Sequence, residues 1–150
     1  MKKYLIVAPK PSVAKTIENV YKNMGEMAEF TADVVSVNCH VVDMNSTKLS
    51  KETLSQFKSF TLKKANVPPR YKISAEDKPF IDRGAAIKEM VKSGHYTAII
   101  NACEPDTDGD LEFQYMIESL GLERCRTERV YLFDLEESLI ESELLTLNDF

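Results

Sequence analysis

The sequence lacks the features that mark membrane and secreted proteins. No apolar run approaches the length that crosses a bilayer, and the apolar stretch near the first residue is too short for a secretion signal. The only three cysteines are Cys39, Cys103 and Cys125, which are widely spaced and form no CxxC pair. They predict neither a disulfide framework nor a zinc site. We therefore expect a cytoplasmic protein with no membrane partner.

Basic residues are scarce in the last third of the chain. Residues 101 to 150 carry 3 basic and 14 acidic side chains, whereas residues 1 to 100 carry 16 basic and 10 acidic ones. The net charge of -5 alone argues against nucleic-acid binding, because phosphate binding relies on lysine and arginine. The uneven distribution instead predicts an acidic site or tail on one side and a mildly basic surface on the other.

The apolar pattern alternates between strand-like and helix-like segments. With 150 residues and 43% hydrophobic content, the chain has the size of one globular domain. Strands are predicted at 4–8, 96–102 and 128–133, with one or two more within 30–42. Helices are predicted at 12–24, 79–94 and 108–121. This alternation predicts a Rossmann-like, layered α/β sheet of mostly parallel strands, with ligands beyond the carboxyl ends of the strands.

Particular residues are expected to begin and end these elements. Ser12 is placed to cap the first helix, and Gly25 to end it. Gly94 and Gly121 are placed to end the second and third helices. The apolar face of the second helix is predicted to hold Ile81, Ala85, Met90 and Val91.

Two segments fit the alternating pattern less well. Residues 45–78 are polar and lysine-containing, and they predict an irregular excursion on the surface. Its aromatic and basic side chains suit either contact with a nucleic-acid backbone or a solvated excursion that buries its aromatics. Residues 134–147 favour a helix whose apolar face needs a packing partner.

Five carboxylates lie within nine positions after the third predicted strand: Glu104, Asp106, Asp108, Asp110 and Glu112. One carboxylate near a helix N-terminus is favourable, so the simplest interpretation is a solvated loop that caps the next helix. Five of them repel one another unless a cation is present or the loop is open to water. Oxygen ligands favour Mg²⁺ or Mn²⁺, and the ion is typically completed by waters and a phosphate.

Two other motifs overlap the same stretch. An EF-hand calcium loop that starts at Glu104 places Gly109 correctly in its sixth position, but Tyr115 stands where a bidentate glutamate is required. The stretch DTDGDL also resembles the Asp-x-Asp-Gly-Thr loop of haloacid-dehalogenase phosphatases. In that family the nucleophilic aspartate follows its strand immediately, so the fit is poor.

The stretches VAPKPSVAKTI and INACEPDTDGDLEF together resemble the toprim domain of type IA DNA topoisomerases, most closely the topoisomerase III branch. In that family the first strand ends in Glu-Lys-Pro-Ser, and a later strand ends in an Asp-Pro-Asp-Arg-Glu-Gly-Glu run. The segments VVSVNCHVVDM and RVYLFDLEESLI are similar to further elements of that domain. The resemblance implies one toprim domain over residues 1–150, as the N-terminal part of a longer protein.

The resemblance also implies roles for individual residues. Glu104, Asp106 and Asp108 match the acidic triad that holds Mg²⁺, with Mn²⁺ as an alternative ion. Lys10 matches a catalytic lysine that faces phosphate. The nucleic-acid contacts implied are Lys10, Ser12 and His40. The expected partners are single-stranded DNA and the remaining topoisomerase domains, one of which supplies the tyrosine that attacks phosphorus.

The sequence departs from the family at two positions that bear on catalysis. Pro9 stands where the family has its catalytic glutamate, and proline can neither transfer a proton nor bind a metal. Thr107 replaces an arginine that pairs with phosphate or a neighbouring acid. We therefore expect this chain alone to be inactive. The alternatives are a catalytically degenerate toprim module that binds metal and nucleic acid, and a toprim-type nuclease.

Overall fold

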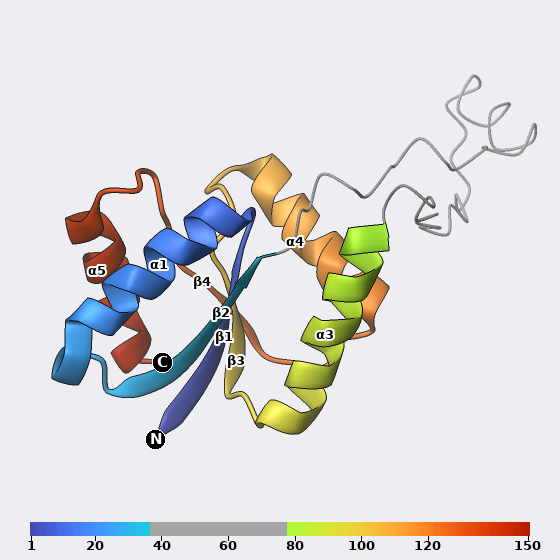
Figure 1. The fold of residues 1–150 in the computed structure, drawn as a ribbon, viewed down its shortest axis with the longest axis horizontal. Coiled ribbons are helices and arrows are strands. Elements are labelled where there is room, and N and C mark those ends of the chain that lie inside the picture. The colour runs from blue at the N-terminus through green and yellow to red at the C-terminus, as the bar shows by residue number, and fades with distance from the viewer. Residues whose placement is uncertain (37–77) are drawn as a thin grey trace, which may run out of the picture.

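The computed structural model describes residues 1–36 and 78–150, with side chains from residue 84 onward in the second range. Its elements in chain order are β1 (Lys2–Ala8), α1 (Pro11–Met24), the 3-10 turn η1 (Gly25–Met27), β2 (Phe30–Ser36), α3 (Lys78–Gly94), β3 (Ala98–Asn101), α4 (Thr107–Leu120), β4 (Thr127–Arg129), α5 (Glu137–Leu145) and the 3-10 turn η5 (Thr146–Asn148). Figure 1 shows the helices on both sides of a central sheet. The predicted strand residues within 37–42 and nearly all of the excursion predicted at 45–78 lie outside the described residues.

The four described strands form one parallel sheet in the order β2-β1-β3-β4. Strand β1 is central, and it pairs along its whole length with β2 and through Tyr4 to Val7 with β3. Consecutive strands that run parallel need a crossover, which the intervening helices provide. The predicted layered α/β sheet is therefore confirmed. Within the described residues, no helix combines the length and apolar character that crossing a membrane requires.

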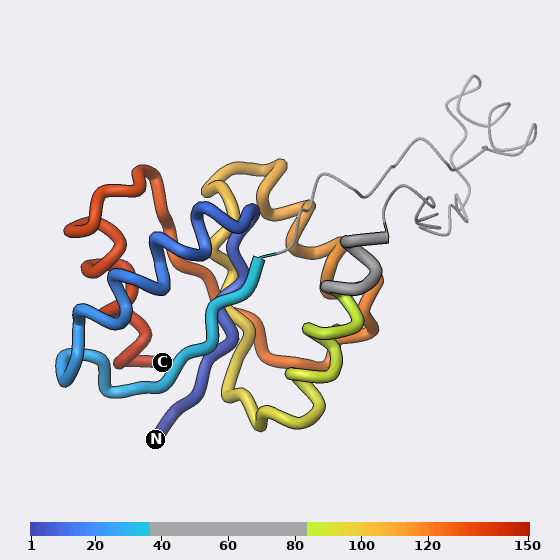
Figure 2. The backbone as a smooth tube through the Cα atoms, viewed as in Figure 1, coloured from blue at the N-terminus to red at the C-terminus, as the bar shows by residue number. Residues whose placement is uncertain are grey.

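Strand β1 is buried on both faces and divides the core into two layers. Tyr4, Ile6 and Ala8 point toward α1 and α5, while Leu5 and Val7 point toward α3 and α4. This alternation follows from the two-residue period of a strand. Figure 2 shows the same separation, with α1 and α5 on one side of the strands and α3 and α4 on the other. An apolar run with no polar alternation is the pattern of a strand covered on both faces.

Helix α5 finds the packing partner that its sequence requires. Ile140, Leu144 and Leu147 have no exposed surface, and they join the core layer formed by α1 and β1. The Tyr4 hydroxyl donates to the carbonyl oxygen of Leu147 at 3.1 Å, and Lys2 Nζ donates to that of Asn148 at 2.8 Å. The end of the chain is therefore fastened to the first strand.

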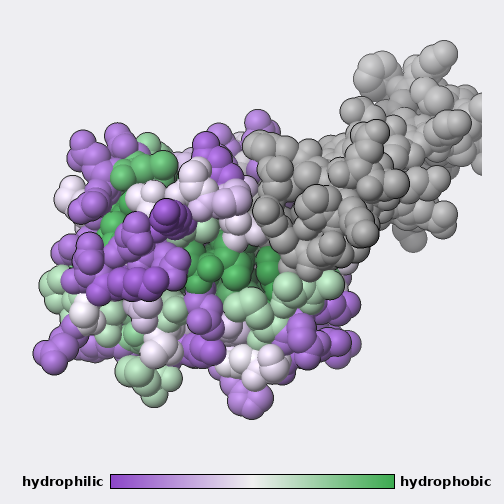
Figure 3. All heavy atoms as spheres, viewed as in Figure 1, coloured by the Kyte–Doolittle hydropathy of each residue, from purple (hydrophilic) through white to green (hydrophobic). Residues whose placement is uncertain are grey.

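Strand β2 lies at one edge of the described sheet and is less well covered than β1. Ala32, Val34 and Val35 are only partly buried, although Phe30 at its start is buried. In the view of Figure 1, Figure 3 shows hydrophobic atoms open to view in the middle of the molecule, with polar atoms beside them. The partial exposure follows from the position of β2, which has a described neighbour on one side only.

Helix α1 begins one residue earlier than the prediction, and Ser12 is not its cap. Pro11 occupies the first helical position, and Lys10 is the capping residue, with no side-chain hydrogen bond. Proline suits this position because its fixed φ is helical and its missing N–H has no partner to lose. Ser12 instead lies in the first turn, where its carbonyl oxygen accepts from the Thr16 hydroxyl at 3.1 Å.

The buried face of α3 also differs from the prediction. Ala85 is exposed, whereas Gly84 and Ile87 are buried, with Met90 and Val91 partly buried. The side chain of Ile81 lies outside the described side chains. Gly84 faces α4, since a Cβ added there lies 2.9 Å from Leu120 Cδ2, so the helix is rotated to bring its smallest residue against its neighbour.

The predicted end of α3 at Gly94 is confirmed, whereas the last strand differs from the prediction by a few residues. Gly94 is the final residue of α3, and the exposed His95 after it takes the left-handed conformation with φ 52°. Strand β4 ends at Arg129 instead of Phe133. The N–H of Val130 still donates to Asn101, where β3 ends, but the N–H of Tyr131 donates to Glu143 Oε2 at 2.8 Å. The sheet stops because β3 offers no further carbonyl.

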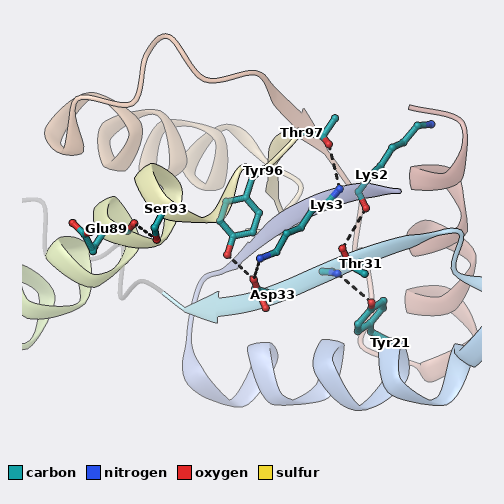
Figure 4. Close-up of polar contacts among 10 residues, drawn as sticks. Lys2, Lys3, Tyr21, Thr31, Asp33, Glu89, Ser93, Tyr96 and Thr97 are labelled. Carbon is teal, nitrogen blue, oxygen red and sulfur yellow. Dashed lines mark hydrogen bonds and ion pairs between the residues drawn. The ribbon is translucent and has the colours of Figure 1, made fainter.

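A polar cluster joins β1, β2 and the residue that precedes β3 by two positions (Figure 4). The Tyr96 hydroxyl donates to Asp33 Oδ2 at 2.5 Å, and Lys3 Nζ lies 3.1 Å from the same oxygen and 4.6 Å from the centre of the Tyr96 ring. Hydrogen bonding from Tyr96 is the main cause that lowers the pKa of the Asp33 carboxyl. Burial, followed by the bond to Asp33, raises the pKa of Tyr96 above its usual range.

Replacing Tyr96 with phenylalanine is expected to lower the free energy of unfolding at pH 7 by about 1 kcal/mol. A hydrogen bond to a charged group contributes roughly 1.5 to 3 kcal/mol when buried, and the partial exposure of Asp33 reduces this value. A carboxyl with a lowered folded-state pKa stabilises the fold above its unfolded pKa and loses that contribution as the pH falls through the folded value. The difference in the free energy of unfolding between wild type and Tyr96→Phe, measured by urea denaturation, should therefore become smaller toward pH 3. A constant gap over this range would contradict the assignment.

Candidate functional site

The carboxyl ends of β1 and β3 form the point at which the sheet switches direction. These strands are neighbours, yet α1 after β1 packs on one face and α4 after β3 packs on the other. Helices that leave to opposite faces open a crevice between the two strand ends, which is where ligands bind in open α/β sheets. Pro9 and Lys10, here called the lysine corner, follow β1. The carboxylates from Glu104 to Glu112, here called the acidic stretch, follow β3.

The structure brings these two stretches together. The N–H of Ala102 donates to the carbonyl oxygen of Val7 at 2.9 Å, so the two chains leave the sheet side by side. A cavity of about 150 Å³ lies next to this bond, where the two chains leave the sheet. It is lined by Pro9, Lys10, Val13, Ala102, Cys103, Glu104, Leu132, Phe133, Asp134 and Leu135. Lys10 and Glu104, which are far apart in the sequence, therefore line one cavity.

The residues of the lysine corner differ in exposure. Pro9 is buried, whereas Lys10 is exposed beside the first turn of α1. Lys10 is extended, with φ -151° and ψ 160°, and its carbonyl oxygen accepts the first helical hydrogen bond from Ala14. The abrupt turn follows from Pro11, whose ring favours an extended residue before it and a helical one at its own position.

The acidic stretch turns tightly into α4. Asp106 caps this helix, because its Oδ1 accepts from the N–H of Gly109 at 2.7 Å. Gly109 packs directly under the start of the turn, where an added Cβ lies 2.1 Å from the carbonyl oxygen of Glu104. The turn therefore has no space for a side chain at position 109, which the sequence pattern alone does not indicate.

Arg129 and Asn101 fasten this turn to the sheet. The Arg129 guanidinium donates to the Asp110 carboxylate and to the carbonyl oxygen of Glu104. Asn101 is buried, and its side chain accepts from the N–H of Cys103 at 2.9 Å and donates to Asp110 at 3.4 Å. Arg129 is only 13% exposed, while Asp110 is 61% exposed. One arginine from β4 therefore holds both ends of the acidic turn.

The carboxylates of the acidic stretch have different roles. Asp110 is paired with Arg129, and Asp106 uses one oxygen as the helix cap. The side chains of Glu104 and Asp108 are exposed and make no hydrogen bond or ion pair within the described part of the chain. Among those same residues, no three histidine, cysteine, aspartate or glutamate side chains gather as a metal cage.

The donor chemistry fits an ion that keeps most of its waters. Mg²⁺ is usually held by one or two carboxylates and completed by waters and a substrate phosphate. Glu104, Asp108 and the second oxygen of Asp106 supply hard donors of this kind, all facing solvent at one turn. The residues therefore suit an open, water-rich magnesium site and do not suit a closed site of four or more protein ligands.

A more open hollow of about 590 Å³ lies beside the Arg129 and Asp110 pair. Its lining includes Asn101, Thr107 and Gln114, but neither Lys10 nor Glu104. Asp110 and Arg129 neutralise each other there, and Glu128 is bound by Arg126 at 2.7 Å. The smaller cavity is the better candidate because it combines Lys10 and Glu104, whose charged groups pair with no other side chain in the described part of the chain.

The remaining predicted residues are only partly placed. Ser12 is exposed in the first turn of α1, close in sequence to Lys10, whereas His40 lies outside the described residues. Cys103 is buried beside the cavity, and Cys125 is partly buried; neither forms a disulfide with another described residue. The sequence matches no model of a known protein family, and no curated protein is significantly similar to it.

Sequence reasoning missed Arg129 and Asn101. Arg129 is one of only three basic residues after position 100, which was a signal that it has a specific acidic partner. Because Asp110 is distant in the sequence, the acidic partner of Arg129 could not be identified in advance. Asn101 lies between apolar residues at the end of a predicted strand, Ile100 before it and Ala102 after it, a pattern that points to a buried hydrogen-bonding role.

Proposed function

We propose that this chain is the toprim domain of a topoisomerase III-like type IA DNA topoisomerase, which binds Mg²⁺ and a DNA phosphate for cleavage and rejoining of single strands. The observation that carries the proposal is the shared cavity of Lys10 and Glu104 at the switch point of the sheet. Two separated sequence motifs of that family predict this juxtaposition. A chance similarity in sequence does not require the two segments to meet in space.

Lys10 is assigned to the phosphate. Its ammonium is exposed at the cavity beside the N-terminus of α1, a 14-residue helix. Helix N-termini present unpaired N–H groups and a partial positive charge, which add to the attraction of a lysine for an anion. The described residues place no carboxylate in hydrogen-bonding contact with Lys10, so its charge is available to a ligand.

Glu104, Asp106 and Asp108 are assigned to Mg²⁺. A metal ion bound here positions the scissile phosphate and offsets the charge that develops during phosphoryl transfer. The protein contributes the rigid turn that carries these carboxylates. Asp106 capping, the close approach of Gly109 and the Arg129 bonds fix that turn before any ligand arrives.

Strand breakage is assigned to a tyrosine on a separate domain. The hydroxyls of Tyr4, Tyr21 and Tyr96 are hydrogen-bonded within the fold, to Leu147, Phe30 and Asp33 respectively. These tyrosines have structural roles away from the candidate site. Because the resemblance implies that a further domain supplies the attacking tyrosine, the chain by itself is proposed to bind and position DNA without breaking it.

A second candidate function is a catalytically degenerate toprim module that binds metal and nucleic acid without turnover. Buried Pro9 favours it, because this residue lines the cavity at the position of the catalytic glutamate in the family. Proline offers no group for proton transfer. Supercoiled plasmid with Mg²⁺ should remain intact for either candidate, and nicking by the purified chain would instead favour a toprim-type nuclease.

The metal and phosphate assignments are tested on one set of variants. Mn²⁺ is expected to raise the melting temperature, since a ligand that binds only the folded state stabilises by about 1.4 kcal/mol at ten times its Kd. Asp108→Asn should weaken this shift, and Glu137→Gln on the exposed start of α5 should leave it unchanged. The same melting curve with and without millimolar Mn²⁺ would overturn the metal assignment.

Single-stranded oligonucleotide binding tests the lysine. Lys10→Ala is expected to weaken binding and to reduce the slope of log K against log salt by about 0.7, the value for one phosphate contact on a single strand. Lys15→Ala, an exposed lysine one turn further along α1, is the matched control. Equal effects of the two variants would leave only a general charge effect and would contradict a specific phosphate site.

A further inference from the structure

The last residue of β4 and the segment that follows it place three planar groups in one row. Arg129, Tyr131 and Phe133 alternate with Val130 and Leu132, which are buried in the core layer of α1 and α5. Burial of Val130 and Leu132 turns Tyr131 and Phe133 outward, and the chain turns tightly between these two rings, where the N–H of Phe133 donates to the carbonyl oxygen of Tyr131 at 3.1 Å. The fold itself therefore produces the row.

The three groups are stacked. The rings of Tyr131 and Phe133 are 6.3 Å apart and inclined by only 15°, and the Arg129 guanidinium carbon lies 5.4 Å from the centre of the Tyr131 ring. Arg129 is in turn bonded to Asp110 and to the Glu104 carbonyl. The row is thus fastened at one end to the acidic turn and ends in Phe133 at the other.

Packing does not account for the two aromatic rings. Phe133 is 75% exposed and Tyr131 is 51% exposed. Large apolar side chains are costly in water, and adjacent exposed rings more often mark a contact surface than a single exposed residue does. Phe133 also lines the cavity that holds Lys10 and Glu104, so the rings are continuous with the candidate phosphate and metal site.

We propose that Phe133 and Tyr131 stack on an unpaired base of the nucleic acid whose phosphate lies at Lys10. The inference rests on the proposed function. Each nucleotide of a single strand offers one anionic phosphate and one flat base, and the cavity edge offers one free cation and one exposed ring for them. Stacking on aromatic side chains is tolerant of sequence, because every base has an aromatic face.

The charges around the rings support an unpaired base over other ligands. Asp134 and Glu136 lie in the same loop, and Glu143 accepts from the N–H of Tyr131. These carboxylates repel a phosphate placed over the rings, but they do not repel an uncharged base. Phosphate is therefore directed to Lys10. A duplex cannot use the rings, since the faces of its bases are covered by neighbouring bases.

A tryptophan reporter tests the contact directly, because the chain contains no tryptophan. Phe133→Trp is expected to lose fluorescence when oligothymidylate is added and to keep it when duplex DNA is added. Phe150→Trp, at a 37% exposed ring near the chain terminus, is the matched control. This residue lies two positions beyond Asn148, which is bonded to the start of β1 at the opposite end of the strands (Figure 1). Equal quenching at both positions would overturn the stacking assignment.

A second measurement separates this inference from the function on which it rests. Wild type should bind oligothymidylate more tightly than an abasic deoxyribose phosphate chain of equal charge, and Phe133→Ala should lose about 5- to 150-fold toward the former only. If wild type binds both polymers equally and Lys10→Ala weakens that binding, the phosphate site is supported and the stacking assignment is overturned. Failure to bind either polymer would overturn both. A concentration-dependent dimer that Phe133→Ala abolishes, without polymer binding, would assign the rings to protein contact instead.

Discussion

Replacing Gly109 with alanine is expected to lower the free energy of unfolding by about 3 kcal/mol. The new methyl group would lie 2.1 Å from the carbonyl oxygen of Glu104. It would also lie 2.9 and 3.0 Å from the carbonyl carbon and the backbone nitrogen of the same residue. Overpacking usually costs about 1 to 3 kcal/mol, and a backbone contact cannot be relieved by a change of rotamer. The acidic turn must therefore shift away from α4.

The same substitution should affect the proposed metal site as well as stability. A displaced turn moves Glu104 relative to Asp108, so the Mn²⁺-dependent rise in melting temperature is expected to disappear. Gly121→Ala is the matched control, because Gly121 has φ 68° but no atom closer than 3.8 Å to its added Cβ. It should cost about 1 to 2 kcal/mol through backbone strain alone and leave the metal response intact. Chemical denaturation gives both costs, and equal losses for the two glycines would show that the close approach has no effect.

Replacing Leu144 with alanine is expected to lower the free energy of unfolding by about 3 kcal/mol. Its side chain has no exposed surface and lies between α5, α1 and the first strand. Removing buried methyl groups costs about 2 to 5 kcal/mol, because the lost transfer energy is joined by the cost of the cavity. For a domain of this size the melting temperature should fall by about 6 to 12 °C.

Helix α5 also offers a control for that change. Ser142→Ala alters an exposed residue of the same helix and should shift the melting temperature by less than about 2 °C. Truncation of Leu144 should leave the rings of Tyr131 and Phe133 able to bind a base if the domain remains folded. A melting temperature that Leu144→Ala leaves unchanged would mean that the end of the chain is not part of the cooperative core.

Much of the fold was predictable because its signals are local. The fully apolar run around Ile6 predicts a strand buried on both faces, and Gly121 marks the end of α4, where it adopts φ 68°. The buried face of α3 was not predictable, since Ala85 and Gly84 are equally compatible with a helical pattern. Only contact with Leu120 selects the glycine. The early end of β4 depends on the length of its neighbour β3, which the sequence around Tyr131 does not contain.

The candidate site was predictable to the level of two segments. Parallel strands followed by helices place Lys10 and Glu104 at one edge of the sheet, and the shared cavity confirms that they meet. The detailed division of roles was not predictable. Whether a carboxylate binds an arginine, caps a helix or remains open to solvent depends on partners distant in sequence, as the bond between Asp110 and Arg129 shows.

The alternation from Arg129 to Phe133 separates two kinds of selection pressure. Val130 and Leu132 are constrained by the interior, so changes there alter stability first. Tyr131 and Phe133 meet solvent, so they can be exchanged with little consequence for folding. Ligand preference at this edge of the molecule can therefore evolve by substitutions at every second position, while the architecture beneath stays constant.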